Sequence, residues 1–281
     1  MRINILHLGL SEFFDRKSDI LYVLCNALSD MGHTTSIGHN KIERSGLNIV
    51  IGSDIISGSP EAISTLIDSK CDFAVFEVEN FNGKTINYRQ NFDLSGYTLL
   101  MENAKFCFTP YHYNIPHLSK IINTNQIAYT KWGFHRSMRC PRIQRNNDFL
   151  HTIFFYGLIK SDRTAKLQKL SNKFGGGLQI VDQSLPFTMR DYFISKSKLG
   201  LSLSYGKIDN FVNPFRLYHM VANGMPVLSD HSEDADGYLH LCNNFEFNIM
   251  VEKIESFEID EKKLKEVCRT EDLIENLKQC F

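Results

Sequence analysis

The stretch Asn210–Asp230, NFVNPFRLYHMVANGMPVLSD, predicts a helix that runs directly into a buried strand. Asn213 and Pro214 give a helix start signal, because a proline in the first turn loses no helical hydrogen bond. The apolar side chains that share one helical face are Leu217, Met220 and Val221. Gly224 ends the helix where a left-handed residue is favoured, and residues 226–230 predict a short strand with a polar carboxyl end. This order constrains the region to an α/β fold.

Two polar side chains of this helix, Arg216 in its first turn and His219 one turn later, are spaced to face the same side. In a parallel sheet, ligands bind beyond the carboxyl ends of the strands, beside helix N-termini that carry partial positive charge. The stretch therefore predicts a site for a sugar diphosphate. The alternative is an ordinary helix whose arginine faces solvent.

The chain has 281 residues, enough for two domains of ordinary size, and a net charge of −1. That balance excludes a global basic field for nucleic acid or an anionic membrane, although a local basic groove is compatible with it. The seven cysteines stand singly, so we expect reduced thiols rather than a disulfide framework. No apolar run reaches about 18 residues, and the N-terminus does not resemble a signal peptide. We therefore expect a cytoplasmic protein without a transmembrane segment.

The beginning of the chain alternates strand and helix signals. Residues 3–8 predict a strand, 11–16 a polar loop, 19–31 a helix and 34–37 a second strand. This order is the opening βαβ unit of a doubly wound sheet. The loop after the first strand holds one glycine, Gly9, and lacks the Gly-x-Gly-x-x-Gly fingerprint of dinucleotide-binding enzymes. A dehydrogenase is therefore disfavoured.

The remainder of the first half contains further strand signals, at residues 47–52, 73–78 and 106–109. Glu77 and Glu79 lie at the carboxyl end of the 73–78 strand. Alternation places both carboxylates on one face if the strand stays extended. The loop that follows contains Asn82 and Lys84.

Residues 131–145, KWGFHRSMRCPRIQR, form the one basic stretch of the chain. The stretch lacks apolar periodicity and contains Pro141, so we interpret it as a linker between two halves. Trp132 and Phe134 give a second interpretation, in which the stretch contacts an acidic acceptor such as DNA through phosphate binding and aromatic stacking. The solvated linker is the favoured interpretation.

The second half again begins with a strand. Its predicted strands are residues 151–156, 178–181, 199–204, 226–230 and 245–251, and further helices are predicted at 164–173, 190–197 and 261–279. We therefore predict an α/β protein with two Rossmann-like domains facing across a cleft. The predicted domains are residues 1–135 and 136–260, with a C-terminal helix in 261–281 that packs back on the first domain.

Three motifs of the second half suggest a known fold. They are Phe154-Phe155-Tyr156-Gly157 followed by Lys160 and Arg163, then Asn213-Pro214-Phe215-Arg216, and finally Ala222-Asn223-Gly224-Met225-Pro226-Val227. Residues 151–230 thereby resemble the nucleotide-sugar domain of the GT-B glycosyltransferases. The outline of the whole chain is similar to the phage DNA β-glucosyltransferases and to group-1-type glycosyltransferases. The resemblance implies a GT-B fold and a nucleotide-diphosphate sugar, such as a UDP-sugar, as donor.

A pyrophosphate requires positive charge and backbone donors. Arg216 can hold it through two hydrogen bonds from its planar guanidinium, and Lys160 or Arg163 on the Gly157 loop can assist. In the resembled family, an acidic residue at the position of His219 binds the ribose hydroxyls; the histidine here is a departure, and a structural histidine is the alternative. The predicted donor-binding residues are Gly157, Lys160, Arg163, Asn213, Arg216 and His219.

An inverting sugar transfer requires a general base for the acceptor hydroxyl. Glu77 and Glu79 are the candidates, because a partly buried carboxylate at a strand end has a raised pKa. The resemblance supports the same residues, since the phage enzymes have their acidic base in a similar place. The alternative is that one of them pairs with Lys84 or Arg89. The residues predicted on the acceptor side are Gly9, Asn82 and Lys84.

Metal ligands are not grouped in this sequence. His112 and His117 lie in a loop with no acid or cysteine to complete a zinc site. Asp230, Asp234 and Asp236 are interpreted as a solvated acidic loop. We therefore predict no metal site and no cofactor other than the nucleotide-sugar co-substrate.

The sequence as a whole predicts a glycosyltransferase that moves a sugar from a nucleotide-diphosphate donor to a hydroxyl acceptor, in a bacterial glycan or glycoconjugate. One alternative is a phage-type DNA-base glucosyltransferase, which requires a basic groove wide enough for a duplex. DNA is the less favoured partner because the net charge is balanced. The other alternative is a non-catalytic nucleotide-binding module of the same fold, which His219 favours.

Overall fold

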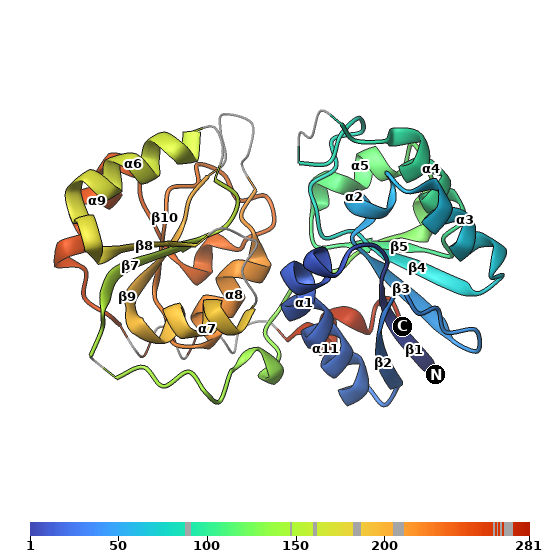
Figure 1. Ribbon diagram of the computed structural model, residues 1–281, viewed down its shortest axis with the longest axis horizontal. Coiled ribbons are helices and arrows are strands. Elements are labelled where there is room, and N and C mark those ends of the chain that lie inside the picture. Colours follow the sequence, from blue (N-terminus) through green and yellow to red (C-terminus); the bar gives the residue numbers. More distant parts are fainter. Residues whose placement is uncertain are drawn as a thin grey trace. The chain divides into compact units, whose positions relative to one another are not determined.

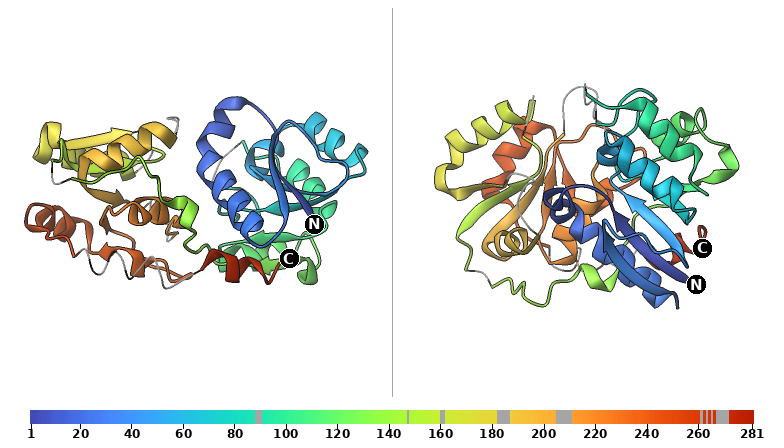
Figure 2. Two further views of the ribbon diagram at one scale, coloured as in Figure 1. Left: turned by 90° about the horizontal axis from the view of Figure 1, so that it is seen from below. Right: turned by 45° about the vertical axis from the view of Figure 1, so that its right-hand side comes forward.

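The computed structural model describes residues 1–87, 91–146, 148–159, 162–181, 187–204, 211–260, 262, 264, 266 and 272–281. The chain divides into two compact units. Unit 1 comprises residues 1–135 and 273–281, and unit 2 comprises residues 136–272. Both chain termini lie in unit 1 (Figures 1 and 2), because the last residues return to it after unit 2 is complete.

Unit 1 contains a six-stranded sheet in which all the described pairings are parallel. Its strands are β1 (Arg2–His7), β2 (Thr34–His39), β3 (Leu47–Ile51), β4 (Asp72–Phe76), β5 (Cys107–Thr109) and β6 (Ile127–Tyr129). Their order across the sheet is β2-β1-β3-β4-β5-β6. Because the strands run in one direction, the residues that follow β1, β3 and β4 meet at one border of the sheet. We call this border edge 1.

The helices of unit 1 lie on both faces of this sheet (Figure 1). They are α1 (Ser11–Asp30), α2 (Ser53–Ile56), α3 (Pro60–Asp68), α4 (Leu94–Glu102), α5 (Ile115–Leu118) and α11 (Leu273–Leu277), with 3₁₀ turns at His112–Asn114 and Thr124–Gln126. Helix α11 packs against α1, and the N–H of Leu273 donates to the carbonyl of Phe134 at 3.0 Å. Most of the rest of the helix predicted at 261–279 lies outside the described residues.

Helix α1 begins at Ser11, so the polar loop predicted at residues 11–16 is wrong. The N–H groups of Phe13 and Phe14 donate to the carbonyl of Leu10 at 3.1 and 3.4 Å, which starts the helix directly after the turn that follows β1. The sequence pattern does not mark the first turns of this helix, because the apolar periodicity that identifies a helix begins about two turns later.

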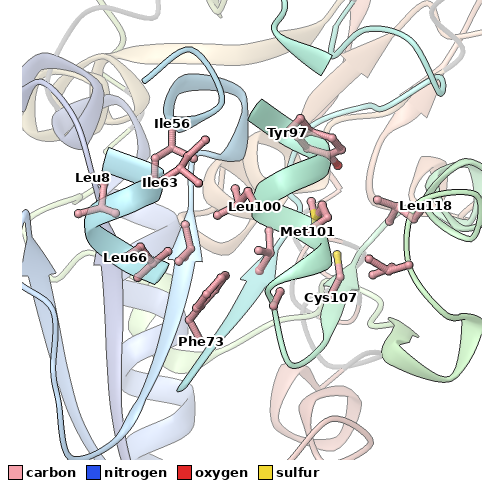
Figure 3. Packing of buried hydrophobic residues seen from close by; sticks show 14 of the residues in the cluster. Leu8, Ile56, Ile63, Leu66, Phe73, Tyr97, Leu100, Met101, Cys107 and Leu118 are labelled. Carbon is pink, nitrogen blue, oxygen red and sulfur yellow. The ribbon is translucent and has the colours of Figure 1, made fainter. Parts of the chain in front are cut away.

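The hydrophobic core of unit 1 packs α3 and α4 against the sheet (Figure 3). Alternate strand residues, among them Leu6, Val50 and Val75, contribute to it, as the two-residue period of a strand requires. The helices contribute Ile63, Leu66, Tyr97, Leu100 and Met101. This packing fixes α4, and it thereby fixes the Tyr97 hydroxyl beside edge 1.

Unit 2 contains a five-stranded sheet, again with parallel pairings throughout its described strands. The strands are β7 (His151–Tyr156), β8 (Leu178–Val181), β9 (Ser197–Ser202), β10 (Val227–Ser229) and β11 (Asn243–Asn244), in the order β11-β10-β9-β7-β8. The residues that follow β7, β9 and β10 form a second border, which we call edge 2.

Helices cover both faces of the sheet of unit 2 (Figure 1). Helices α6 (Asp162–Phe174) and α9 (Phe247–Ser256) lie on one face, and α7 (Phe187–Lys196) and α8 (Pro214–Ala222) lie on the other, with 3₁₀ turns at Arg136–Met138, Gly175–Gly177 and Leu239–Leu241. The predicted helix that leads into a strand is therefore α8 followed by β10. In the described part of either unit, no helix has both the length and the apolar character that crossing a bilayer requires.

The strand predicted at residues 245–251 is wrong, because most of this segment belongs to helix α9. The buried residues of α9 are Met250, Val251 and Ile254. Residues 250 and 254 are one helical turn apart and face the core of unit 2. The run FNIMV was read as a strand because a short apolar run by itself does not distinguish a buried strand from a buried helix.

The basic stretch 131–145 is anchored along part of its length rather than solvated. Trp132 is 2% exposed and stacks on Phe76, with 5.8 Å between ring centroids. The guanidinium of Arg145 donates to three main-chain carbonyls, those of Ile194, Ser197 and Lys198. Burial lowers the pKa of Arg145 to about 10. Trp132 is therefore not available to stack on a nucleic-acid base, and Arg145 is committed to the main chain.

Candidate functional site

Edge 2 brings together most of the residues predicted to bind a donor. The residues at the strand ends are Tyr156, the last residue of β7, with Gly157 after it, Leu203 and Ser204 after β9, and Asp230 and His231 after β10. Strand β9 lies between the other two, so these three ends are neighbours. Helix α8 connects β9 to β10 and runs back along the sheet, which places its N-terminus at the same edge.

The guanidinium of Arg216 lies against Gly157. A Cβ atom added at Gly157 would come within 2.5 Å of Arg216 Nη2, and the φ of Gly157 is 142°. Both the close approach and the backbone conformation therefore require glycine here. The guanidinium is also 5.4 Å from the centroid of the Tyr156 ring. Asn213 accepts a hydrogen bond from Arg216 N at 3.0 Å and caps the helix. A strand end, a helix start and an arginine are thus fixed together.

Arg163, predicted to assist at the pyrophosphate, supports the main chain instead. Its Nε and Nη2 donate to the carbonyl of Leu203 at 3.0 and 2.7 Å, and its Nη1 donates to the carbonyl of Leu158 at 3.2 Å. The side chain ties the residue after β9 to the loop after β7. It contributes positive charge to edge 2 while its donors are used inside the protein. Lys160, its predicted partner, lies outside the described residues.

His219 is part of a buried hydrogen-bonded group. Its Nε2 lies 2.8 Å from Asp191 Oδ1, and its Nδ1 lies 3.1 Å from the Tyr156 hydroxyl. Burial acts to raise the pKa of Asp191, but the hydrogen bond and charge of His219 outweigh it and lower that pKa. Both ring nitrogens of His219 are therefore engaged by protein groups. Asp191 escaped the sequence analysis because it lies 28 residues from His219 on another helix.

Asp230 is buried and paired, so the prediction that it belongs to a solvated acidic loop is wrong. Its Oδ1 accepts from the backbone N–H of Ser204 at 2.6 Å, and its Oδ2 lies 2.5 Å from Lys166 Nζ. The side chain of Asp230 is 1% exposed. The pair joins the ends of β9 and β10 to α6, which explains why a carboxylate at a strand end is enclosed.

Several cationic side chains gather at edge 2. Among the described residues they include Arg163, Lys166, Arg190 and Arg216, and the carboxylates of Asp191 and Asp230 nearby are each engaged by protein groups. The guanidinium of Arg190 lies over the ring of Tyr156, 5.5 Å from its centroid. A group of cations of this kind suits an anion such as a pyrophosphate.

Edge 1 carries the two glutamates predicted as bases, and their surroundings differ. Glu77 is 0% exposed. Its Oε2 accepts from the hydroxyls of Ser53 at 2.6 Å and Tyr97 at 2.9 Å, and its Oε1 accepts from the N–H of Glu79 at 2.9 Å. Burial raises the pKa of Glu77 to about 7, against the lowering effect of these hydrogen bonds. Glu77 is thus enclosed by protein donors.

Glu79 reaches the surface and forms an ion pair. Its carboxylate lies 2.7 Å from Lys17 Nζ, and its side chain is 23% exposed. Lys17 Nζ also contacts Asp54 at 2.9 Å. Burial acts to lower the pKa of Lys17, but the charges of Asp54 and Glu79 raise it above its ordinary value. Because β4 ends at Phe76, the alternation that was to place both glutamates on one face does not extend to Glu79.

The residues predicted on the acceptor side have mixed roles. Gly9 follows β1 and is held by Asn40, whose Oδ1 accepts from Gly9 N at 2.8 Å and whose Nδ2 donates to Gly9 O at 3.0 Å. Asn82 shapes its own turn, because its Oδ1 accepts from the N–H groups of Lys84 and Thr85. Lys84 itself is exposed. Of these residues, Gly9 lies at edge 1.

His7, the last residue of β1, belongs to no sequence motif. Its ring is fully buried, and in the described part of the chain neither nitrogen meets a hydrogen-bond partner. Burial, followed by the charges of Lys17 and His39, lowers the pKa of His7 to about 4. A histidine inside a strand gives no pattern that distinguishes it from an apolar core residue, so no sequence signal pointed to it.

Metal-binding groups are not assembled in the described ranges, where no three His, Cys, Asp or Glu side chains gather as ligands. The ring of His112 stacks on Tyr129, and the ring of His117 packs against Tyr113 and Phe81. These two histidines are therefore used in aromatic packing.

Comparison with known proteins gives a fold. The sequence matches no model of a known protein family and no curated protein. An α-glucosyltransferase solved with UDP and a 13-mer DNA containing an HMU base is similar in structure, with a TM-score of 0.68 and 11% identity, over 100% of this chain and 98% of that one. The lipopolysaccharide outer core galactosyltransferase WaaB has a TM-score of 0.51 and 11% identity, over 99% and 98% of the two chains.

A third similar structure is a putative UDP-N-acetylglucosamine 2-epimerase from Listeria monocytogenes, with a TM-score of 0.57 and 10% identity, over 100% of this chain and 95% of that one. At this level of identity the likeness concerns the fold. The chain has the GT-B fold, built of two parallel α/β units, and the predicted α/β class with two Rossmann-like domains is confirmed.

Proposed function

We propose that the protein is a glycosyltransferase that moves a sugar from a nucleotide diphosphate to a hydroxyl group. The observation that carries this proposal is Arg216, held over Gly157 at the N-terminus of α8, with Arg163 and Arg190 at the same edge. A guanidinium binds a pyrophosphate through paired, charge-assisted hydrogen bonds, and the helix start adds backbone N–H groups. Uridine diphosphate is the first choice of nucleotide, because similar structures were solved with UDP.

The proposed chemistry assigns one role to each edge. The bond between the anomeric carbon and the pyrophosphate oxygen breaks, and a bond from the acceptor oxygen to that carbon forms. Glu79 takes the proton of the acceptor hydroxyl, because its carboxylate is the exposed one of the pair, and attack opposite the leaving group inverts the configuration. The cations of edge 2 offset the charge of the leaving pyrophosphate, so no metal is required. Both substrates must be brought together during transfer.

The proposed acceptor is a saccharide hydroxyl of a glycan or glycoconjugate. At edge 1 the carboxylates of Asp54 and Glu79 are both paired with a single cation, Lys17. Such a site disfavours the phosphates of a nucleic acid. A DNA base is the second candidate acceptor, because α-glucosyltransferases of the same fold were solved with DNA. The third candidate, a non-catalytic nucleotide-binding protein, is favoured by His219, whose nitrogens are engaged by Asp191 and Tyr156.

Replacing Arg216 by alanine tests the donor site. Arg216→Ala should weaken UDP binding at least tenfold, about 1.4 kcal/mol, because a charge-assisted contact is lost. The measurement is isothermal titration calorimetry at fixed salt, with Arg142→Ala, an exposed arginine of the same unit, as the matched control. Equal affinity in both variants would remove Arg216 from the site.

Transfer assays separate the three candidates. The wild-type protein is incubated with UDP-glucose and either an oligosaccharide acceptor or a duplex that carries a hydroxymethylated base, and labelled product is measured. Product on the oligosaccharide supports the first candidate, and product on the duplex supports the second. UDP binding without product or hydrolysis on any acceptor would support the non-catalytic protein.

A further inference from the structure

His231 is a fixed, buried histidine at edge 2. It follows β10 and is 3% exposed. Its backbone is held on both sides, since its N–H donates to Ser229 Oγ at 3.3 Å and its carbonyl accepts from Asn244 Nδ2 at 2.7 Å. Its Nε2 lies 3.2 Å from Ser202 Oγ, within hydrogen-bonding distance. The ring therefore has one defined partner and little freedom to rotate.

The other ring nitrogen, Nδ1, is enclosed and meets no hydrogen-bond partner in the described part of the chain. An imidazole nitrogen is a donor or an acceptor in every tautomer, and leaving one unsatisfied inside a protein costs free energy. Buried groups of this kind call for a water or a ligand as partner. The polarity of the surroundings indicates which partner fits.

Cations surround this ring. Arg163 and Lys166 from α6 and Arg216 from α8 act on it, and together with burial, which is the largest cause, they lower the pKa of His231 to about 3. The neighbouring carboxylate, Asp230, is engaged by Lys166 and by the N–H of Ser204. His231 is thus neutral at pH 7, in a region that favours an anionic partner.

We propose that His231 is a ligand of the nucleotide diphosphate, with Nδ1 hydrogen-bonded to an oxygen of the pyrophosphate. The inference rests on the proposed function and adds a binding residue to it. Ser202 orients the ring through Nε2, which leaves Nδ1 as the nitrogen that serves the ligand. The pyrophosphate lies between His231 and Arg216, on the side of edge 2 where the positive charge gathers.

A proton accompanies the ligand in this proposal. When an anion binds among Arg163, Lys166 and Arg216, it offsets their charges and accepts a hydrogen bond from Nδ1, so the pKa of His231 rises. The complex then holds more protons than the free protein below the new pKa. By linkage, affinity for the diphosphate increases as the pH falls through the pKa that His231 has in the complex.

Two amide substitutions separate a ligand role from a structural role. The amide of asparagine reaches the position of Nδ1, whereas the amide of glutamine reaches the position of Nε2. His231→Asn should therefore keep affinity for UDP-glucose within about threefold, and His231→Gln should lose about tenfold or more, a difference of about 1.4 kcal/mol. Stronger binding by the Gln variant than by the Asn variant would overturn the proposal, because it would show that the Ser202 contact alone matters.

Proton uptake provides the second readout. Titration of the wild-type protein with UDP-glucose over the acidic pH range in which it stays folded, in buffers of different ionisation enthalpy, should show net uptake of protons. UDP-glucose is the chosen probe because its phosphates have no ionisation in this range. Uptake should vanish in His231→Gln and persist in His240→Gln, an exposed histidine of the same unit. Equal uptake in all three proteins would assign the proton to another group and overturn the proposal.

A measurement without nucleotide distinguishes failure of this inference from failure of the proposed function. The pKa of the His231 ring is followed by NMR in the wild-type protein, with and without inorganic pyrophosphate, which also covers the case in which a variant does not fold. A rise with pyrophosphate but no binding of UDP-glucose would retain the anion site and reject the nucleotide-sugar donor. UDP binding that depends on Arg216, with no change in the His231 pKa, would retain the donor site and reject His231 as its ligand.

Discussion

Glu77 and Glu79 show how two identical side chains, two residues apart, acquire different chemistry. The carboxylate of Glu77 accepts hydrogen bonds from the hydroxyls of Ser53 and Tyr97. The carboxylate of Glu79 is partly exposed and contacts Lys17. The sequence placed both at a strand end but could not rank them, because three of their partners, Ser53, Tyr97 and Lys17, lie 20 to 62 positions away. Of the two, Glu79 can meet an acceptor without rearrangement of the core.

The substitution Glu79→Gln tests this assignment. It should lower turnover roughly 10²-fold, since the amide cannot take the proton of the acceptor hydroxyl. Affinity for UDP should stay unchanged, because edge 2 lies in the other unit. Steady-state rates and calorimetry are compared with those of Glu61→Gln, an exposed glutamate of α3. Full turnover in Glu79→Gln would place the base elsewhere or indicate a retaining reaction.

Among the helices and strands, sequence patterns predicted those whose formation depends on neighbouring residues. The start signal of α8, its apolar face and the strand after Gly224 all appear in the structure, because each depends on neighbours within a few residues. Where a pattern was short or hidden, the prediction failed, as at α9 and at the first turns of α1. Arg163 shows a further limit, because its hydrogen-bond acceptor, the carbonyl of Leu203, lies 40 residues away along the chain.

The contact between the end of β7 and helix α8 gives a prediction about Gly157. Gly157→Ala should displace Arg216, because the added Cβ would lie 2.5 Å from Nη2, and should strain a backbone with φ of 142°. We expect UDP affinity to fall at least about tenfold and stability to fall by about 1 kcal/mol or more. The control is Gly176→Ala, in the same unit, where an added Cβ meets nothing within 4 Å. Calorimetry measures the UDP affinity and urea unfolding measures the stability. Equal losses in Gly157→Ala and Gly176→Ala would contradict the close contact between Gly157 and Arg216.

At the scale of the whole molecule, the repeated order of strands and helices was enough to predict two parallel α/β units. That repetition follows from the short range of helix and strand preferences. The composition of the two edges was not predictable in the same way. His7, Lys17, Asp191 and His231 belong to no sequence motif, because the burial that distinguishes them is set by the fold. The sequence thus located both edges, and the structure supplies the residues that define their charge.

The buried carboxyl of Glu77 makes the stability of the protein depend on pH in a defined direction. Its pKa is about 7 in the folded protein and about 4.3 in an unfolded chain, so between these values the folded state holds the proton and the unfolded state does not. The contribution of Glu77 to the free energy of unfolding is therefore complete below about pH 4.3 and is lost as the pH rises through about 7. Glu77→Gln does not titrate, so its stability relative to wild type should increase by roughly 2 to 3 kcal/mol between about pH 5 and about pH 8. Urea unfolding at both pH values, with Glu61→Gln as the exposed control, measures this, and a pH-independent difference would show that Glu77 is ionised in the folded protein across the range.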